Sequence, residues 1–365
     1  MQENAALQAE PKASADYRIL DLVRSIAVLL VVFRHVFEYY KVHETAWFQE
    51  WPFGTSGVLI FFVHTSLVLM FSMMRSEAKE AQTGTRAYVS FMIRRIFRIY
   101  PLSMLAILLA YFVFGVAMKE AQTIPALLAN LALVQNFIGY ENVLVPLWSL
   151  PLEMAMYLLL PIFFFAMKKR AFPVAIGATV LAFAGAYLEH KFKLNQFFAY
   201  APCFMGGILA YSLWFKSKRF LAWWWVPIYL LVAVVAYMAF YAKTGMRGVA
   251  GAPMCIGLGF ILAFAKDMPT GWLSRTAKQV ATYSYGIYLF HELFFRFFVL
   301  RVFGYTEGQP VKDAAVFLPL GIALVCTGIA SVASFHLIEQ PMIRVGQRIA
   351  SSFRGRRKVA LESSP

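Results

Sequence analysis

Long apolar runs with few charges constrain the fold of this chain more than any other feature. Of its 365 residues, 60% are hydrophobic and only 15% are charged, whereas roughly a quarter of the residues in soluble domains are charged. A hydrocarbon layer is crossed by roughly 20 apolar residues in a helix. Lipid cannot satisfy open backbone groups, so helices are the expected spanning elements. The sequence therefore predicts an all-α, polytopic transmembrane helical bundle.

About ten spans are expected along the chain. They are predicted at residues 19–40, 54–74, 101–118, 146–167, 172–188, 196–215, 221–242, 247–265, 284–303 and 315–338. The apolar segment at residues 124–137 is too short for a full crossing and is predicted to be a half-span or an interfacial helix.

Basic residues alternate between the loops and predict the orientation. With the N-terminus inside, 23 of the 34 Lys and Arg residues fall in cytoplasmic segments and 8 in external ones, counting span ends with their loops. This bias predicts that both termini are cytoplasmic. Membrane topology thus accounts for the net charge of +15, and we expect no nucleic-acid partner. The three cysteines lie in apolar runs without metal-ligand spacing, so we expect no metal.

Three regions are predicted from these patterns. Residues 1–16 are polar and are expected to form a disordered cytoplasmic tail. Residues 17–345 form the transmembrane domain, and residues 346–365 form a basic cytoplasmic tail. The RGRRK run in this last tail is expected to contact anionic membrane lipids.

The first span carries charged residues that are costly in lipid and therefore candidates for function. Arg24 and His35 are eleven residues apart, which places them on one helix face, roughly 16 Å apart along the axis. Asp21 precedes Arg24 by three residues and is expected to pair with it. The structural alternative is an interfacial Asp21–Arg24 pair and a packing histidine.

Arg95 and Arg98 lie in the segment FMIRRIFRIYP, whose proline, Pro101, is expected to start the third span. The two arginines share a helix face, and guanidinium groups present a planar fork that suits phosphate. The alternative is an ordinary cluster of positive charge at the cytoplasmic surface, which is the interpretation for Arg94.

Polar side chains interrupt two later spans. Glu153 stands alone in an apolar helix, after Trp148 and with Ser149 four residues before it on the same face. Ser284, Tyr288 and His291 follow helical spacing and form a polar stripe. The structural alternative for these residues is that they form hydrogen bonds between packed helices. This structural role is also the interpretation for His64 and His336.

Five segments in order resemble the acyltransferase 3 family of integral membrane acyltransferases. They are RILDLVRSIAVLLVVFRHV, RRIFRIYP, LWSLPLEMAMYLLLP, YSYGIYLFH and FHLIEQP. The family's arginine-x10-histidine pattern falls on Arg24 and His35, and its arginine-x2-arginine pattern falls on Arg95 and Arg98. Its tryptophan-serine-leucine-x2-glutamate pattern falls on Trp148, Ser149 and Glu153. The common LDGLR reads LDLVR here, which keeps Asp21 and Arg24.

The resemblance implies O-acyl transfer, usually of acetyl, from cytoplasmic acetyl-CoA to a hydroxyl of a glycan or glycolipid acceptor. It also implies a multi-pass protein of the bacterial inner membrane, with a polysaccharide assembly complex as one possible partner. In this hypothesis His35 is the catalytic general base, and Glu153 or His291 orients it or holds the acceptor. Arg24, Arg95 and Arg98 bind the donor. Ser149, Tyr288 and Trp148 are the candidate oxyanion donors, and the sequence does not distinguish among these three.

The same residues also allow other mechanisms and functions. His35 could instead be acylated itself, which would give ping-pong kinetics. Buried charges and histidines also suit a proton-coupled transporter or a flippase of a polar or lipid-linked substrate. A third reading is a non-catalytic membrane subunit of a polysaccharide assembly complex. Acetyl-CoA turnover by the purified protein would separate the enzyme from the other two.

Overall fold

The computed structural model describes residues 17–39, 53–80, 84–116, 119–244, 247–305 and 314–353. Within these ranges the regular structure is helical, apart from one isolated bridge between Leu221 and Ala265. The α-helices are α2 (Arg18–Tyr39), α3 (Phe53–Glu80), α4 (Gly84–Leu108), α5 (Ile124–Leu131), α6 (Gln135–Ile138), α7 (Ser149–Met167), α8 (Ala171–Phe192), α9 (Gln196–Trp214), α10 (Trp225–Thr244), α11 (Arg247–Phe264), α12 (Trp272–Phe295), α13 (Phe317–Ser334) and α14 (Gln340–Ser351). The predicted all-α fold is confirmed.

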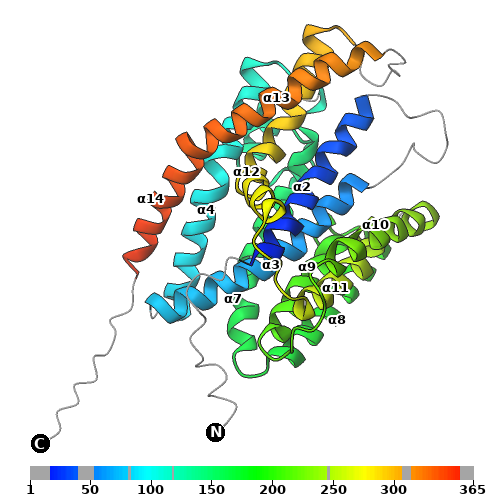
Figure 1. The fold of residues 1–365 in the computed structure, drawn as a ribbon. Coiled ribbons are helices and arrows are strands. Elements are labelled where there is room, and N and C mark those ends of the chain that lie inside the picture. Colours follow the sequence, from blue (N-terminus) through cyan, green and yellow to red (C-terminus); the bar gives the residue numbers. More distant parts are fainter. Residues whose placement is uncertain are drawn as a thin grey trace, which may run out of the picture.

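Helices α2, α3 and α12 form the centre of the bundle. Helix α2 packs between α3 and α12, and α3 also packs against α9 (Figure 1). Helix α3 is apolar on several faces, and Leu59, Phe62 and Leu67 are fully buried. A helix that is hydrophobic all round is expected to be surrounded by other elements. The charged residues of α2 are therefore held between the apolar helix α3 and helix α12.

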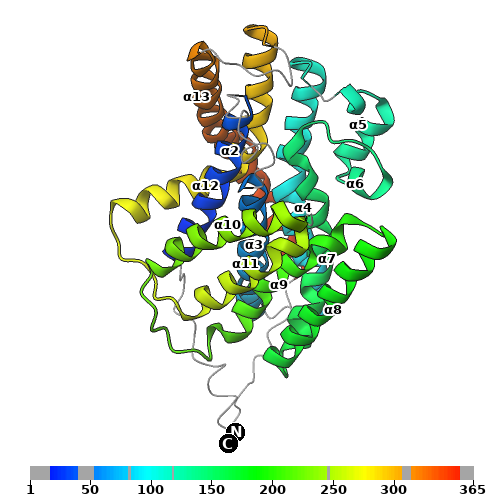
Figure 2. The same cartoon turned by 90° about the vertical axis from the view of Figure 1, so that its right-hand side faces the viewer.

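Helices α8 to α11 gather beside α3 on one side of the molecule (Figures 1 and 2). Glycines let α9 and α11 approach closely. A Cβ atom at Gly206 of α9 would lie 2.1 Å from the carbonyl oxygen of Cys255, and one at Gly259 of α11 would lie 2.0 Å from that of Gly206. Small residues at such crossings are typical of packed membrane helices.

The segment at residues 124–137 forms two short helices, α5 and α6, beside α4 and α7 (Figure 2). The prediction that it does not make a full crossing is confirmed. The amide of Asn130 is fully buried and holds the following loop: Nδ2 donates to the carbonyl of Glu141 at 2.9 Å, and Oδ1 accepts from the Val143 backbone at 3.0 Å. This loop is therefore fixed against the bundle and can line a site.

Within the described residues, six helices are long and apolar enough to cross a membrane. They are Phe53–Ala78, Gly84–Val113, Val145–Met167, Ala171–Phe192, Gln196–Trp214 and Phe317–Ser351. The other four expected spans correspond to α2 and α12, which carry charged residues, and to α10 and α11, whose apolar stretches are shorter. The structure is thus that of a helical membrane bundle. The count of ten and the cytoplasmic termini stay predictions.

Three predicted helix ends were wrong. Helix α4 begins at Gly84, so Pro101 lies inside it and does not start it. Helix α12 begins at Trp272, twelve residues before the predicted span. Helix α13 continues through the π-helical turn η6 (Phe335–Glu339) into α14, past residue 338, where the last span was predicted to end. In each case polar helical turns extend an apolar helix, and hydropathy reports only the apolar part. The predicted tail at residues 1–16 lies outside the described residues.

Candidate functional site

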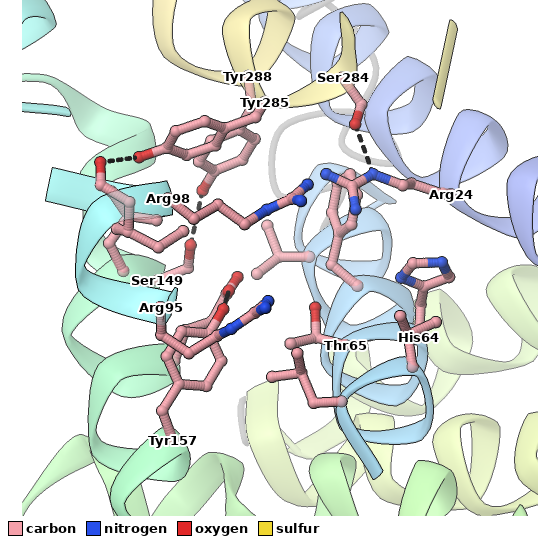
Figure 3. Close-up of a pocket in the computed structure, with 17 residues that line it drawn as sticks. Arg24, His64, Thr65, Arg95, Arg98, Ser149, Tyr157, Ser284, Tyr285 and Tyr288 are labelled. Carbon is pink, nitrogen blue, oxygen red and sulfur yellow. Dashed lines mark hydrogen bonds between the residues drawn. The ribbon is translucent and has the colours of Figure 1, made fainter. Parts of the chain in front are cut away.

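Two cavities between the helices share a wall. The first, called here the arginine cavity, has a volume of about 110 Å³ and is drawn in Figure 3. The second, called here the amide cavity, has a volume of about 440 Å³. Val58 of α3 and Tyr288 of α12 line both cavities. These two side chains therefore form the boundary between the two spaces.

The arginine cavity is cationic. Arg24 from α2 and the pair Arg95 and Arg98 from α4 point into it, as Figure 3 shows. Its other polar lining residues are His64, Thr65, Ser149, Glu153, Tyr157, Ser284, Tyr285 and Tyr288. Three guanidinium groups against one carboxylate leave an excess of positive charge in the lining. Such a space suits a ligand that carries phosphate.

Each arginine is held by the structure around it. The Nε of Arg24 donates to Ser284 Oγ at 2.6 Å, and Nη2 of Arg98 lies 3.7 Å from the Glu339 carboxylate. The guanidinium carbon of Arg95 lies 5.7 Å from the ring centre of Phe91. The Nε of Arg95 is buried and has no hydrogen-bond partner among the described residues. The predicted shared face of Arg95 and Arg98 is confirmed, because both side chains line one cavity.

Glu153 lies in the arginine cavity and not in the amide cavity. Its carboxylate accepts a hydrogen bond of 2.8 Å from Tyr157 Oη, one helical turn further along α7. Ser149 lines the same cavity, as its spacing from Glu153 predicts. His35 lines the amide cavity instead. The structure therefore places the two predicted catalytic residues in different cavities.

His35 is surrounded by residues of α12. Its Nδ1 lies 3.3 Å from the carboxylate of Glu292, and its ring centre lies 5.1 Å from that of His291. Arg24 also contacts α12, through Ser284. Because Arg24 and His35 both reach the same neighbouring helix, the predicted shared face on α2 is confirmed.

Tyr288 joins α12 to the start of α7. Its hydroxyl donates to the carbonyl of Pro146 at 2.5 Å and lies 2.8 Å from Ser149 Oγ. The neighbouring Trp148 lines the amide cavity, with its ring centre 5.0 Å from that of Tyr200. Trp148 and Ser149 are adjacent at the start of α7, but Trp148 lines the amide cavity whereas Ser149 lines the arginine cavity.

The amide cavity is lined by polar and aromatic groups. The loop held by Asn130, together with its flanking residues between 136 and 148, supplies much of its wall, and the remainder comes from α2, α3, α9 and α12. Its polar and aromatic lining residues are Arg34, His35, Thr55, Asn136, Tyr140, Glu141, Asn142, Trp148, Gln196, Tyr200 and Tyr288. Amides and aromatic rings of this kind can bind a polar, uncharged ligand through hydrogen bonds and stacking.

Asp21 lines neither cavity. Its backbone carbonyl accepts a hydrogen bond from Ser25 Oγ at 2.8 Å. Arg24, for which Asp21 was the expected partner, donates to Ser284. Asp21 is therefore not a wall residue of either cavity, and its expected pairing with Arg24 stays a prediction.

Three further residues belong to these sites and were not assigned to them from sequence. His64 lines the arginine cavity, and its Nδ1 is buried without a hydrogen-bond partner among the described residues. Glu339 pairs with Arg98, and Glu292 contacts His35. Glu292 follows Tyr288 by four residues, so extending the polar stripe by one turn would have found it. Among the described residues no cluster of His, Cys, Asp or Glu could hold a metal ion.

Comparison with known proteins matches the same part of the chain. The acyltransferase 3 family model, described as an acyltransferase domain, matches residues 17–335. Nodulation protein 10 of Rhizobium leguminosarum bv. viciae is 24% identical over 311 residues, covering 75% of this chain and 81% of the relative. Acyltransferase MdmB of Streptomyces mycarofaciens is 25% identical over 336 residues, covering 80% of this chain and 81% of the relative. No solved structure matches the chain significantly.

Proposed function

Because the chain belongs to the acyltransferase 3 family, we propose that it transfers an acetyl group from acetyl-CoA to a hydroxyl of a sugar. The family carries acyltransferase activity. The proposed acceptor is a sugar of an exopolysaccharide, a lipopolysaccharide or a lipid-linked glycan, and the proposed location is the bacterial inner membrane. The observation that carries this proposal is the pair of unlike cavities that meet at Tyr288.

The arginine cavity is the proposed donor site. Coenzyme A carries several phosphates, and Arg95 and Arg98 offer planar forks that bind them. With the N-terminus inside, as the basic loops predict, this cavity lies nearer the cytoplasm, where acetyl-CoA is made. Arg24 and His64 line the same space from the side opposite Arg95 and Arg98. They would contact the uncharged arm of the donor that leads towards Tyr288.

The amide cavity is the proposed acceptor site. Its amide groups can bind sugar hydroxyls, and Trp148 and Tyr200 offer faces on which a sugar ring can stack. His35 lies on the wall of this cavity, on the same helix as the donor-side Arg24. An acceptor hydroxyl bound here can reach both His35 and a thioester that arrives past Tyr288.

The transfer then needs one base and one oxyanion donor. His35 takes the proton of the acceptor hydroxyl while the hydroxyl oxygen attacks the thioester carbonyl carbon. The carbonyl oxygen gains the electron pair, and Tyr288 Oη or Ser149 Oγ stabilises it by hydrogen bonding. The carbon–sulfur bond breaks as the carbonyl re-forms. The departing thiolate takes the proton from His35, which leaves an ester, free coenzyme A and a neutral imidazole.

A combined genetic and biochemical experiment tests this function. The gene is deleted and restored with native, His35→Ala or His190→Ala protein, and O-acetyl signals of the surface glycans are measured by NMR. Thiol release from acetyl-CoA is measured with each purified protein. The native chain and the His190→Ala control, whose histidine is exposed, are expected to restore both signals. The His35→Ala variant is expected to restore neither.

Two results would reject the proposal. Full activity of a well-folded His35→Ala protein would remove His35 from the chemistry. Unchanged glycans after deletion, together with no thiol release by the native protein, would favour the transporter or flippase. The native protein is incubated with acetyl-CoA, quenched and analysed by mass spectrometry. Detection of an acetyl-histidine would indicate the covalent intermediate rather than direct transfer.

A further inference from the structure

His35 and Glu292 form a buried contact between two helices. The Nδ1 of His35 on α2 lies 3.3 Å from Oε2 of Glu292 on α12. His35 is only 7% exposed and Glu292 only 3%. A carboxylate so far from water is costly unless donors compensate it. Its place in the fold therefore calls for an explanation beyond packing.

The contact decides which nitrogen of His35 faces the ligand. His35 lines the amide cavity, whereas Glu292 does not line it. The Nδ1 side of the ring is therefore turned to the carboxylate on α12, and the Nε2 side is turned towards the cavity. A carboxylate next to Nδ1 favours the tautomer with the proton on Nδ1. In that tautomer Nε2 carries the lone pair that a base needs.

His291 adds no opposing charge beside this contact. Its Nδ1 lies 2.9 Å from the carbonyl of Ile287, so Nδ1 carries the donating proton. Its Nε2 is buried without a hydrogen-bond partner among the described residues. A second proton on that nitrogen would create a buried charge with no hydrogen-bond acceptor. Glu292 is thus the charged group of α12 that faces His35 within ion-pair distance.

We propose that Glu292 is a positioning residue for acyl transfer, which holds His35 with Nε2 towards the acceptor and stabilises the imidazolium that forms during the reaction. This inference rests on the proposed function. Base and orienting carboxylate are then supplied by two different helices, α2 and α12. An acceptor hydroxyl in the amide cavity completes a hydroxyl–imidazole–carboxylate arrangement of the kind that activates oxygen nucleophiles.

Steady-state kinetics of the full-length protein in lipid nanodiscs test the proposal. Glu292→Gln keeps the shape but loses the charge, and kcat is expected to fall by at least about 100-fold. The KM for acetyl-CoA is expected to stay within about twofold, because the donor binds in the other cavity. Glu292→Asp keeps a carboxylate and is expected to retain more activity than Glu292→Gln. Glu189→Gln, on helix α8, is the matched control and is expected to leave kcat unchanged.

A double-mutant cycle separates positioning from a merely structural role. If Glu292 acts through His35, then Glu292→Gln lowers the residual activity of His35→Ala no further. Glu292→Met serves if the Gln variant does not fold, because an apolar side chain brings no polar group that needs a hydrogen-bond partner in this buried position. It is expected to show the same loss of kcat.

The outcomes distinguish this inference from the proposed function. Native kcat in Glu292→Gln or Glu292→Met would overturn the inference, and so would an independent loss in the His35→Ala background. In either case an active native enzyme and a His35→Ala protein with strongly reduced activity would leave the proposed function standing. A native protein without transfer activity would overturn both.

Discussion

The hydroxyl groups of Tyr288 and Ser149 lie 2.8 Å apart at the place where the arginine cavity meets the amide cavity. Tyr288 donates to the carbonyl of Pro146, so Ser149 is the donor in the bond between the two hydroxyls. Both hydrogen atoms can turn towards an oxyanion that forms between the cavities. A donor and an acceptor site on either side of two hydroxyls is the arrangement that thioester transfer needs.

Replacing Tyr288 is therefore expected to impair the chemical step. Tyr288→Phe removes the hydroxyl and should lower kcat by about 10²–10³-fold, the usual loss for one oxyanion donor. Ser149→Ala should have a smaller effect, because Ser149 lines only one of the two cavities. The measurement is thiol release from acetyl-CoA at saturating substrates.

Tyr283→Phe is the matched control for this experiment. Tyr283 lies on the same helix, but its hydroxyl is 3.5 Å from His336 Nε2, away from both cavities. Its loss should leave kcat unchanged. Native kcat in Tyr288→Phe would remove Tyr288 from the oxyanion site and leave Ser149 as the candidate.

The arginine pair on α4 is expected to govern donor binding. Arg95→Lys and Arg98→Lys keep the charge but lose the planar fork, so the KM for acetyl-CoA should rise about tenfold, equal to the loss of about 1.4 kcal/mol of binding. The kcat at saturating donor should change little. Arg98→Lys also alters the pair with Glu339, and its effect should exceed that of Arg95→Lys.

Arg170→Lys, at an exposed position before α8, is the control for the arginine pair. Competition with coenzyme A and with its 3′-dephospho form reports which phosphate each arginine contacts. If both lysine variants bind the donor as the native protein does, the arginine cavity is not the phosphate site.

Asn130 is expected to control the acceptor side without touching the acceptor. Asn130→Ala leaves the buried Val143 amide without its partner, at about 1–3 kcal/mol, and also removes the hydrogen bond to the Glu141 carbonyl. The loop that lines the amide cavity should then open more often. Hydrogen exchange of residues 139–145 should become faster, and acyl transfer should fall.

Binding of coenzyme A provides the contrast for Asn130→Ala. It should remain native, because the loop does not line the arginine cavity. Equal losses of coenzyme A binding and of transfer would mean that the variant disturbs the whole bundle. In that case the loop would have no separate role.

The sequence predicts the parts of this structure that depend on local pattern. Apolar runs located the helices, and the spacing of Arg24 and His35 placed them on one face. Spacing also placed Arg95 with Arg98 and Ser149 with Glu153. Each of these relationships lies within one helix, where a period of 3.6 residues fixes which side chains are neighbours.

Contacts between helices could not be predicted in this way. Ser149 and Tyr288 are 139 residues apart, and Glu292 approaches His35 only because α12 packs against α2. No periodicity encodes which helices pack together. The division of the site into two cavities follows from that packing, and so does the separation of Glu153 from His35.

The close crossing of α9 and α11 gives a prediction about stability. A Cβ atom at Gly206 would lie 2.1 Å from a backbone oxygen, which cannot move without shifting α11. Gly206→Ala should therefore destabilise the bundle by about 1–3 kcal/mol, as overpacked cores do. The measurement is the midpoint of thermal unfolding in detergent, which should fall by several degrees.

Gly177→Ala on α8 is the opposite case, because a Cβ atom there has no neighbour within 4 Å. Alanine favours the helix over glycine, so this variant should be stabilised by about 0.4–1 kcal/mol. The two variants add the same methyl group within helices, and they differ only in whether another backbone lies against it. Equal midpoints for both would show that α9 and α11 do not approach through Gly206, and that α3, which packs on both helices, is positioned by other contacts.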